Sequence, residues 1–511
     1  MRRRFFFVAL SLGLAASACS LTLDTDLGRG VGELCTSASE CAGKSATCDA
    51  GICAVPCDAG CPAPSRCNVA KNICAPAGAL RVGDACTQAA ECSTFDCTDG
   101  LCSQPCTVTS ECPGGSVCIE RACTRQLNVA FVLDNVVSTA KDGFALTHEQ
   151  ARASLEGRLP WLVTQRLEGA NSDNVNALID TGLANGADVV LMTSSRFTAE
   201  AKGKAAEAPG KKFAVYASSV TGTNIAGYSA RFHQAWYLAG VSGATIASRE
   251  NRKHLAYLGA VASPEVVRQL NAFTIGARSV DPEIVVEVVW ANGFVPPEGV
   301  MKALVGSLIE SGASVIANRL GTNAALAEIQ AQTPVGGPKV WSIGLNNPTA
   351  CDGTPTTCLG ATYFNWAPVY EALFDDMRRG RWNPGVVADA FIKQDAAKSP
   401  FSFAVNEAAD PALANLKPRL PQIISQSLVG PAGEDLTFRG PLTPISNREP
   451  IPAGSQVPDA ELASMCWLVE GIVERDVPGD ANSPLVAGKF PKGGPAWPPG
   501  PTGIPLGCGE L

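Results

Sequence analysis

The stretch VRQLNAFTIGARSVDPEIVVEVVWANGF, residues 267–294, contains the pattern that decides the fold. Its first part has the apolar spacing of a helix, and a turn follows at Asp281-Pro282. The run IVVEVVW that comes next is short and β-branched, which is typical of a strand. Two aromatic residues, Trp290 and Phe294, stand where that strand ends. The stretch therefore predicts one helix-strand unit of an α/β fold, with aromatic side chains at its end.

The same alternation of helix and strand extends from residue 126 to residue 476. We predict strands over residues 127–133, 187–193, 213–217, 255–261, 284–290, 313–317 and 340–343. The segments between them have helical length and spacing, for example residues 149–159, 175–185, 235–248, 263–279 and 300–311. Most strand runs are apolar on both faces, which indicates parallel sheets covered by helices. Because roughly 350 residues exceed the usual size of one domain, we predict two doubly wound α/β lobes.

In doubly wound sheets, ligands bind beyond the carboxyl ends of the strands, where loops and helix N-termini converge. The side chains expected there are mainly aromatic rings, amides and hydroxyls. The predicted ligand-binding residues are Asp142, Phe144, His148, Ser194, Ser218, Trp290, Phe294, Asn318, Asn346, Asn365 and Trp366. Such a set suits a neutral, flat ligand that forms hydrogen bonds. Core packing is the alternative for both Trp290 and Phe294, and for His148 the alternative is helix capping or packing.

Cysteines define a second region, which precedes the α/β domain. Of the 21 cysteines, sixteen lie between Cys35 and Cys123 in two sets of eight, offset by 49 or 51 residues. This internal repeat predicts two small disulfide-rich modules, residues 35–78 and 79–125, whose pairing the sequence leaves open. The region lacks a CxxC pair and histidine, so we predict no metal. The modules form either a rigid stalk, which we favour, or a surface that holds a partner or the envelope.

The two ends of the chain carry further signals. Residues 1–19, MRRRFFFVALSLGLAASAC, have the layout of an export signal, and Ala16 to Cys19 resembles a bacterial lipobox. We expect Cys19 to be lipidated, with cleavage by an ordinary signal peptidase as the alternative, and residues 20–34 to form a linker. Near the other end, disulfides are expected between Cys351 and Cys358 and between Cys466 and Cys508. The Pro- and Gly-rich tail, residues 477–511, is expected to be irregular.

Composition and motifs exclude several classes of function. The net charge of -8 argues against a nucleic-acid partner. The chain has three histidines and no HExxH, GxSxG, Walker A or GxGxxG motif, and the predicted ligand-binding residues lack a paired general acid and base. We therefore predict that the protein is not an enzyme and uses no cofactor.

Several long segments resemble one family, the basic membrane protein family of bacterial substrate-binding lipoproteins, which serve ABC transporters and include purine nucleoside receptors. The segments are DGFALTHEQARASLEG (142–157), NIAGYSARFHQAWYLAGVSGATIAS (224–248), NAFTIGARSVDPEIVVEVVWANGF (271–294), ATYFNWAPVY (361–370) and MCWLVEGIVE (465–474). The resemblance covers about residues 126–475 and implies a periplasmic binding protein of type I, in which two lobes joined by a hinge close on a small molecule.

The resemblance also implies roles for single residues. Phe294 stands where the family places an aromatic residue against the ligand ring, and Phe144 matches the residue that covers its opposite face. Nucleoside-binding members carry aspartates where this chain has Ser218-Ser219 and the residues after Gly344, including Asn346. Hydroxyls and amides bind less strongly than carboxylates, so weaker affinity or a different ligand is implied.

Three functions follow as hypotheses. The first is an exported, lipid-anchored receptor that delivers a nucleoside-like solute to an ABC permease. The second is a sensory or adhesive envelope lipoprotein of the same fold without a permease, which the cysteine repeats favour. The third, a hydrolase that uses the same cleft, is the least supported. Ser20 after the lipidated cysteine allows an outer-membrane as well as an inner-membrane location.

Overall fold

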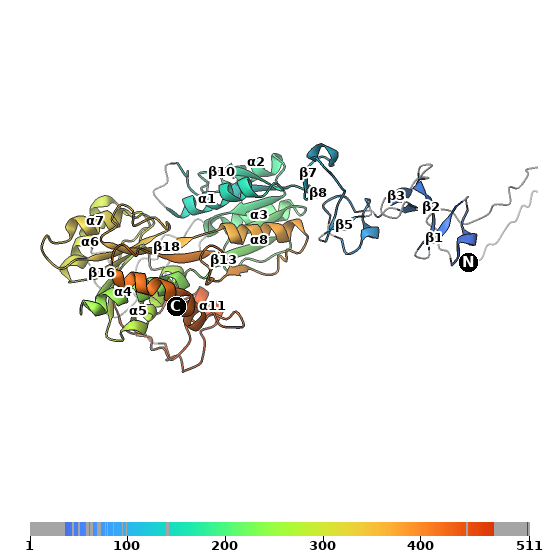
Figure 1. Ribbon diagram of the computed structural model, residues 1–511. Coiled ribbons are helices and arrows are strands. Elements are labelled where there is room, and N and C mark those ends of the chain that lie inside the picture. Colours follow the sequence, from blue (N-terminus) through green and yellow to red (C-terminus); the bar gives the residue numbers. More distant parts are fainter. Residues whose placement is uncertain are drawn as a thin grey trace, which may run out of the picture. The chain divides into compact units, whose positions relative to one another are not determined.

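The computed structural model describes residues 36–138, 143–445, 448–474 and 508, except for short gaps at 43–44, 50–51, 58–60, 62–64, 69–72, 77, 79, 85, 95 and 99. The chain divides into two compact units, residues 1–107 with 121–123 and residues 108–120 with 124–511 (Figure 1). Cys19, Cys35, Asp142, the linker at 20–34 and the tail apart from Cys508 lie outside the described residues. Within the described part, no helix has the length and apolar character to cross a membrane.

Short strands tied by disulfides make up the Cys-rich unit. The strands β1 (Thr47–Asp49), β2 (Ile52–Pro56), β4 (Ile73–Pro76) and β3 (Ser65–Asn68) form one antiparallel sheet in that order, and β5 (Cys97–Thr98) pairs with β6 (Leu101–Cys102). Its disulfides join Cys41 to Cys53, Cys57 to Cys67, Cys61 to Cys74, Cys86 to Cys97 and Cys92 to Cys102. Sulfur atoms lie close enough in three places to suggest a metal site, but these cysteines are disulfide-bonded and offer no thiolate.

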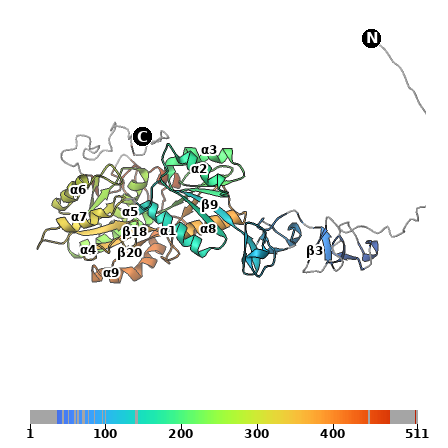
Figure 2. The same cartoon turned by 90° about the horizontal axis from the view of Figure 1, so that it is seen from above.

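The second unit begins with η4 (Thr109–Glu111) and β7 (Ser116–Ile119), and the last residues of β8 (Ala122–Arg125) lead into the α/β domain. Lobe 1 of that domain is a parallel sheet in the order β10 (Leu162–Leu167), β9 (Leu127–Val132), β11 (Val189–Met192), β12 (Lys212–Tyr216), β13 (Ile225–Ala230) and β19 (Ala388–Ala390). The helices α1 (Gly143–Arg158) and α8 (Ala367–Arg378) pack on one face, and α2 (Val175–Ala184) and α3 (Thr198–Glu207) lie side by side on the other (Figure 2). The sheet is thus covered on both faces, as its apolar strands require.

Lobe 2 repeats this design. Its sheet has the order β20 (Phe401–Val405), β18 (Cys358–Phe364), β17 (Trp341–Leu345), β16 (Val315–Arg319), β14 (His254–Gly259), β15 (Val285–Trp290) and β21 (Ile472–Glu474), and β20 alone of these strands runs antiparallel. The helices α4 (His233–Arg249) and α5 (Pro264–Val280) cover one face, and α6 (Glu298–Glu310) and α7 (Ala324–Gln332) cover the other. The remaining helices are α9 (Pro411–Leu416), α10 (Leu420–Ile423) and α11 (Asp459–Ala463).

The chain passes between the lobes three times, and these crossings form the hinge. Residues 231–232 join β13 to α4, residues 365–366 join β18 to α8, and residues 391–400 join β19 to β20. Aromatic rings line the crossings: the Phe232 and Phe364 rings stack at 3.8 Å, and the Phe364 and Trp366 rings stack at 4.8 Å. One buried apolar cluster contains residues of both lobes and of the hinge, so the hinge is part of the core.

Helices α4 and α5 pack against each other at very short range, which two glycines permit. A Cβ atom on Gly240 would lie 2.0 Å from the Phe273 carbonyl oxygen, and one on Gly276 would lie 2.1 Å from the Tyr237 carbonyl oxygen. Real Cβ atoms do not approach oxygen so closely, so these positions require glycine for the helices to keep their separation.

Replacing Gly240 by alanine is therefore expected to lower the free energy of unfolding by about 1 to 3 kcal/mol, because the helices must move apart. Urea unfolding of the full chain, followed by circular dichroism, measures this loss. Gly203→Ala in α3 is the matched control, since a Cβ there meets no atom within 4 Å. An exposed helical glycine replaced by alanine should stabilise the protein by about 0.5 to 1 kcal/mol. Equal effects of the two substitutions would contradict the close packing of α4 and α5.

The fold class predicted from the sequence is confirmed, because both sheets are doubly wound and share the same internal strand order. Each of the seven predicted strands coincides with an observed one within two residues at either end. Of the strands in the two sheets, β10, β13, β18, β19, β20 and β21 were not predicted, and α3, α7 and α8 are not among the helices named from the sequence. β10, with the sequence LVTQRL, is a partly exposed edge strand without a continuous apolar run, so its pairing with β9 is decided by the sheet.

Candidate functional site

The carboxyl edges of the two sheets face each other in the α/β domain. The Gly143 amide, at the start of α1 in lobe 1, donates a hydrogen bond of 3.0 Å to the Gly321 carbonyl, which follows β16 in lobe 2. A Cβ on Gly143 would also lie 3.0 Å from Cβ of Asn346, the residue after β17. The backbone of Asn346 has a φ of +62°, which asparagine adopts more readily than most residues. The first turn of α1 therefore touches lobe 2 at the ends of two of its strands.

Phe144 belongs to an aromatic cluster at this edge. Its ring lies 4.5 Å from the His148 ring, 5.3 Å from Tyr216 and 5.4 Å from Phe364, all with edge-on or tilted geometry. Trp366 completes the cluster, stacked on His148 at 4.8 Å with an interplanar angle of 12°. Edge-to-face and offset contacts of this kind stabilise aromatic pairs beyond the area that they bury. The cluster joins the carboxyl edge of lobe 1 to the hinge.

His148 is fully buried within this cluster. Its Nδ1 atom pairs with the Tyr370 hydroxyl, which also lies 3.2 Å from the Tyr228 hydroxyl. Its Nε2 atom has no hydrogen-bond partner among the described residues. Burial lowers the pKa of His148 from its ordinary value of 6.5 to about 3, because the apolar surroundings disfavour the charged ring. The histidine is therefore neutral at physiological pH and acts as a packing residue in this structure.

Phe294 lies on the opposite edge and has a different environment. Its side chain is 42% exposed, and the Arg319 guanidinium lies 5.5 Å from its ring centroid, a cation–π contact. The Phe294 carbonyl accepts a hydrogen bond of 2.6 Å from the Gly321 amide, which fixes the loop after β15 against the end of β16. An exposed ring that is held in place in this way offers a face to a ligand.

The other predicted ligand-binding residues have more varied positions. Trp290 is 7% exposed, packs on Gly259 and donates from Nε1 to Glu474 at 3.4 Å. Asn318 is buried and closes the turn after β16 through Thr322 and Leu320. Ser194 caps η5 (Ser195–Phe197), and Ser218 is exposed. Asn346 contacts α1. Asn365 donates hydrogen bonds to the carbonyls of Ala397 and Ser399 in the hinge. Phe144, Phe294 and Asn346 therefore lie around the contact between the lobes, whereas Trp290, Asn318, Asn365 and Trp366 bind or pack against protein.

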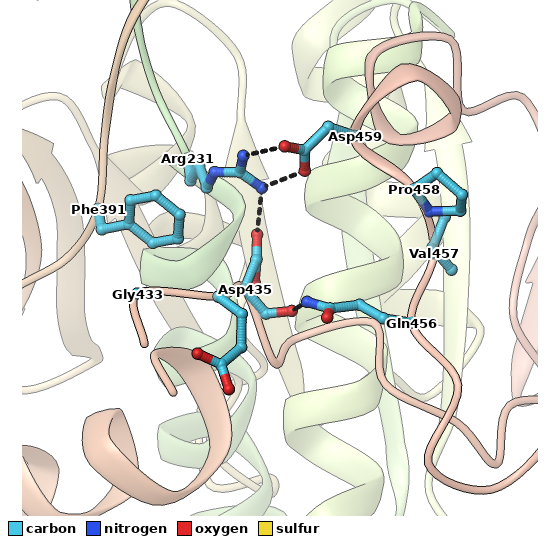
Figure 3. A pocket seen from close by; sticks show the side chains of 9 residues that line it. Arg231, Phe391, Gly433, Asp435, Gln456, Val457, Pro458 and Asp459 are labelled. Carbon is cyan, nitrogen blue, oxygen red and sulfur yellow. Dashed lines mark hydrogen bonds and ion pairs between the residues drawn. The ribbon is translucent and has the colours of Figure 1, made fainter. Parts of the chain in front are cut away.

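The two cavities described in the structure lie beside the hinge and contain none of the predicted residues. One, of about 450 Å³, has an apolar wall formed by Ile392, Ile424 and Val429. The other, of about 290 Å³, surrounds Arg231 (Figure 3). Arg231 lies in the first crossing, and its guanidinium pairs with Asp459 at 2.8 Å, with Asp435 at 3.2 Å and with Asp389 at 2.8 Å. Phe391 covers one face of that guanidinium at 4.5 Å.

This hinge cluster connects both lobes. Asp389 belongs to β19 in the sheet of lobe 1, whereas Asp435 and Asp459 belong to the C-terminal segment that packs on lobe 2. Burial alone would raise the pKa of Asp435, but His233 at 2.7 Å and hydrogen bonds from Thr437 hold it below its usual range. These residues were not predicted, because β19 was not recognised as a strand and the charged residues lie far apart in the chain. One signal was available in the sequence: Arg231 is a cation in the short segment between β13 of lobe 1 and α4 of lobe 2.

Tyr216, Glu265 and Arg319 were also missed, although each stands at a carboxyl edge. Tyr216 ends β12, Arg319 ends β16, and Glu265 opens α5 directly after the loop that follows β14. Tyr216 lay inside the predicted strand 213–217, and of the two residues after the predicted strand 313–317 only Asn318, not Arg319, was expected in the site. A tyrosine or an arginine in the final position of an apolar strand would have identified two of the three.

Two doubly wound lobes, three crossings and facing carboxyl edges define a two-lobed periplasmic binding protein of type I. Residues 162–411 match the family model Bmp, described as ABC transporter substrate-binding protein PnrA-like. This match confirms the resemblance to the basic membrane protein family over residues 162–411. The family consists of substrate-binding proteins.

Two relatives and a solved structure illustrate the similarity. A putative ABC transporter glucose-binding protein, TsgA13, of Haloferax volcanii is 27% identical over 249 residues, which are 49% of this chain and 60% of that protein. A purine-binding protein of Brucella abortus is 26% identical over 339 residues, 65% of this chain and 89% of that protein. An ABC transporter solute-binding protein of Aeropyrum pernix, a solved structure, has 13% identity and a TM-score of 0.48, and covers 58% of this chain and 91% of its own.

Proposed function

We propose that this chain is an exported, lipid-anchored solute-binding protein that holds a nucleoside-like molecule between its lobes and presents it to an ABC permease. The observation that carries the proposal is that the two carboxyl edges meet at Gly143, Gly321 and Asn346, beside the three crossings of the hinge. Ligands of doubly wound sheets bind at these edges. The family supports a receptor for a transporter, and the similarity to a purine-binding protein and to a putative glucose-binding protein supports a ligand with a base or a sugar.

Two rings from opposite lobes support recognition of a flat group. Phe144 comes from the first turn of α1, and Phe294 follows β15, so a ligand between the lobes would meet one ring on each side. Phe144 is held by the surrounding aromatic cluster, and Phe294 is held by Arg319 and by the hydrogen bond from Gly321. Rings that are positioned before binding lose little conformational entropy when a ligand arrives.

Replacing Phe294 by alanine is expected to weaken nucleoside binding by about 1 to 3 kcal/mol, the range for one base stacked on an aromatic ring. Titration calorimetry of the mature full-length protein with inosine, adenosine, uridine and hypoxanthine measures it. Phe144→Ala is expected to act in the same direction, with an added loss of stability because its ring is packed.

Val295→Ala supplies the matched control, because Val295 is as exposed as Phe294, at 42%, and stands next to it in the chain. The control is expected to bind each ligand as the unaltered protein does. Unchanged nucleoside affinity in Phe294→Ala would show that the Phe294 ring does not contact the ligand. The absence of binding to every nucleoside, base and simple sugar would refute the receptor function itself.

The disulfide-rich modules favour a second candidate, a sensory or adhesive envelope protein with the same fold. At least five disulfides make this unit a covalently braced element, which a transport receptor does not need for solute capture. Cell fractionation separates the two functions, because a receptor for a permease must reach the inner membrane. Recovery of the protein in the outer membrane alone would favour the second function.

A further inference from the structure

The ligand-facing edge of lobe 2 holds a connected group of polar side chains. Arg319 ends β16, and Glu265 and Gln269 lie one turn apart at the start of α5. The Gln269 amide donates to Glu265 Oε1 at 3.0 Å, and Arg319 Nε donates to Gln269 Oε1. Arg319 Nη2 lies 3.6 Å from Glu265 Oε1, so the carboxylate and the guanidinium form a neutral pair.

The burial of this group rises from its outer to its inner member. The side chain of Glu265 is 41% exposed, that of Arg319 is 8% exposed, and Gln269 is 1% exposed. Gln269 holds both charged groups from within the core, which fixes their geometry. Among the described residues, Arg319 donates a hydrogen bond through Nε and forms an ion pair through Nη2, which leaves Nη1 as a donor without a protein acceptor. A buried guanidinium that keeps a donor at this edge can act as a specific recognition element.

Lobe 1 contributes Tyr216 to the same space. Tyr216 ends β12, and its ring contacts Phe144 at 5.3 Å. Burial raises the pKa of the Tyr216 phenol, the Glu265 carboxylate raises it further, and the cations of Arg268 and Arg319 lower it. Tyr216 thus adjoins Phe144 in lobe 1, and Arg319 adjoins Phe294 in lobe 2.

The combination of charges selects the chemistry of the ligand. The Glu265 carboxylate repels an anionic ligand group such as a phosphate or a carboxylate, and the Arg319 guanidinium repels a cationic group. A hydroxyl both donates and accepts, so it can donate to the carboxylate and accept from the guanidinium. Two adjacent hydroxyls on a ring present these functions side by side, and a neutral carboxylate–guanidinium pair can satisfy both.

We propose that Glu265 and Arg319 bind adjacent hydroxyls of a neutral sugar ring and thereby determine the specificity of the site. The ligand is then a nucleoside or a sugar with a vicinal diol, and neither a nucleotide nor a free base. This inference rests on the proposed function, since it takes the facing edges of the lobes as the ligand site.

The test compares ligands that differ by one group, with the mature full-length protein in titration calorimetry. Inosine is expected to bind at least about tenfold more tightly than 2′-deoxyinosine, hypoxanthine or inosine monophosphate, because each of these lacks the diol or adds an anion. In Glu265→Gln the preference for inosine over 2′-deoxyinosine is expected to fall to within about twofold. Arg319→Lys keeps the charge, loses the planar fork, and is expected to reduce the same preference.

Glu298→Gln is the matched control, because Glu298 opens α6 as Glu265 opens α5, is 74% exposed and pairs with Lys302 at 2.8 Å. It is expected to keep the preference of the unaltered protein. Inosine binding with a preference that survives in Glu265→Gln would overturn the inference and leave the proposed function standing. If the protein binds no nucleoside but binds glucose or ribose, and if that binding weakens in Glu265→Gln, the result would support the diol site. No binding of any nucleoside or sugar would refute both.

Discussion

Replacing Trp366 by alanine is expected to lower the free energy of unfolding by about 3 to 5 kcal/mol, the usual cost of removing a large buried aromatic side chain. Trp366 has no exposed surface and lies in the second crossing of the hinge. Its ring is stacked between Phe364 and His148, each at 4.8 Å, and its Nε1 donates to Thr147 Oγ1 at 3.2 Å. A cavity at this position would remove contacts from α1, from β18 and from the hinge together.

Urea unfolding of the full-length protein at pH 7 measures the effect. Trp382→Ala is the control, since Trp382 is only partly buried against the same apolar cluster, and its loss should be about half as large or less. Trp366→Phe keeps an aromatic ring in the stack and should lie between the two. A loss of less than about 1 kcal/mol for Trp366→Ala would mean that the hinge does not depend on this ring.

Acid is expected to destabilise the protein through His148. The pKa of His148 is about 3 in the folded protein, whereas an unfolded chain takes up the proton near pH 6.5. The unfolded state therefore binds more protons between these values, so the free energy of unfolding falls as the pH decreases from 6.5 toward 3. Between pH 7 and pH 4 this residue should account for about 3 kcal/mol of that decrease.

His148→Phe isolates this contribution, because it keeps a ring in the aromatic cluster and removes the titrating group. The Tyr370 hydroxyl retains the neighbouring Tyr228 hydroxyl at 3.2 Å in this variant. Unfolding free energies at pH 7, 6, 5 and 4 should decrease less steeply in the variant than in the unaltered protein. Parallel pH profiles for the two proteins would show that His148 reaches solvent and takes up a proton without unfolding.

Stacked rings connect the aromatic cluster to the crossing that contains Arg231. Phe232 in the first crossing stacks on Phe364, which leads through Trp366 to His148 and Phe144 at the carboxyl edge of lobe 1. Arg231, the neighbour of Phe232, is held by carboxylates of both lobes. Closure of the lobes on a ligand would therefore change the surroundings of one continuous set of side chains.

The sequence by itself determined the fold class and the covalent frame of the Cys-rich region. Continuous β-branched runs such as IVVEVVW specify buried parallel strands because both faces must avoid water, whatever the neighbouring strand is. The cysteine repeat specifies disulfide-rich modules because small exported units have too little apolar surface to fold without them. Ser263 and Pro264 also mark the start of α5, where Ser263 accepts a hydrogen bond from Val266. All of these signals are local.

The tertiary structure alone decided which side chains share a site. Trp366 and Phe294 have similar chemistry and both follow strands, yet the first is fully buried in the hinge and the second is 42% exposed. β10 and β19 are strands only because the sheet of lobe 1 offers them partners. Glu265, Gln269 and Arg319 meet although about 50 residues separate the last two in the chain. The burial of a side chain and its polar contacts depend on segments that are distant in sequence, and a local pattern of residues does not show which distant segments will lie beside it.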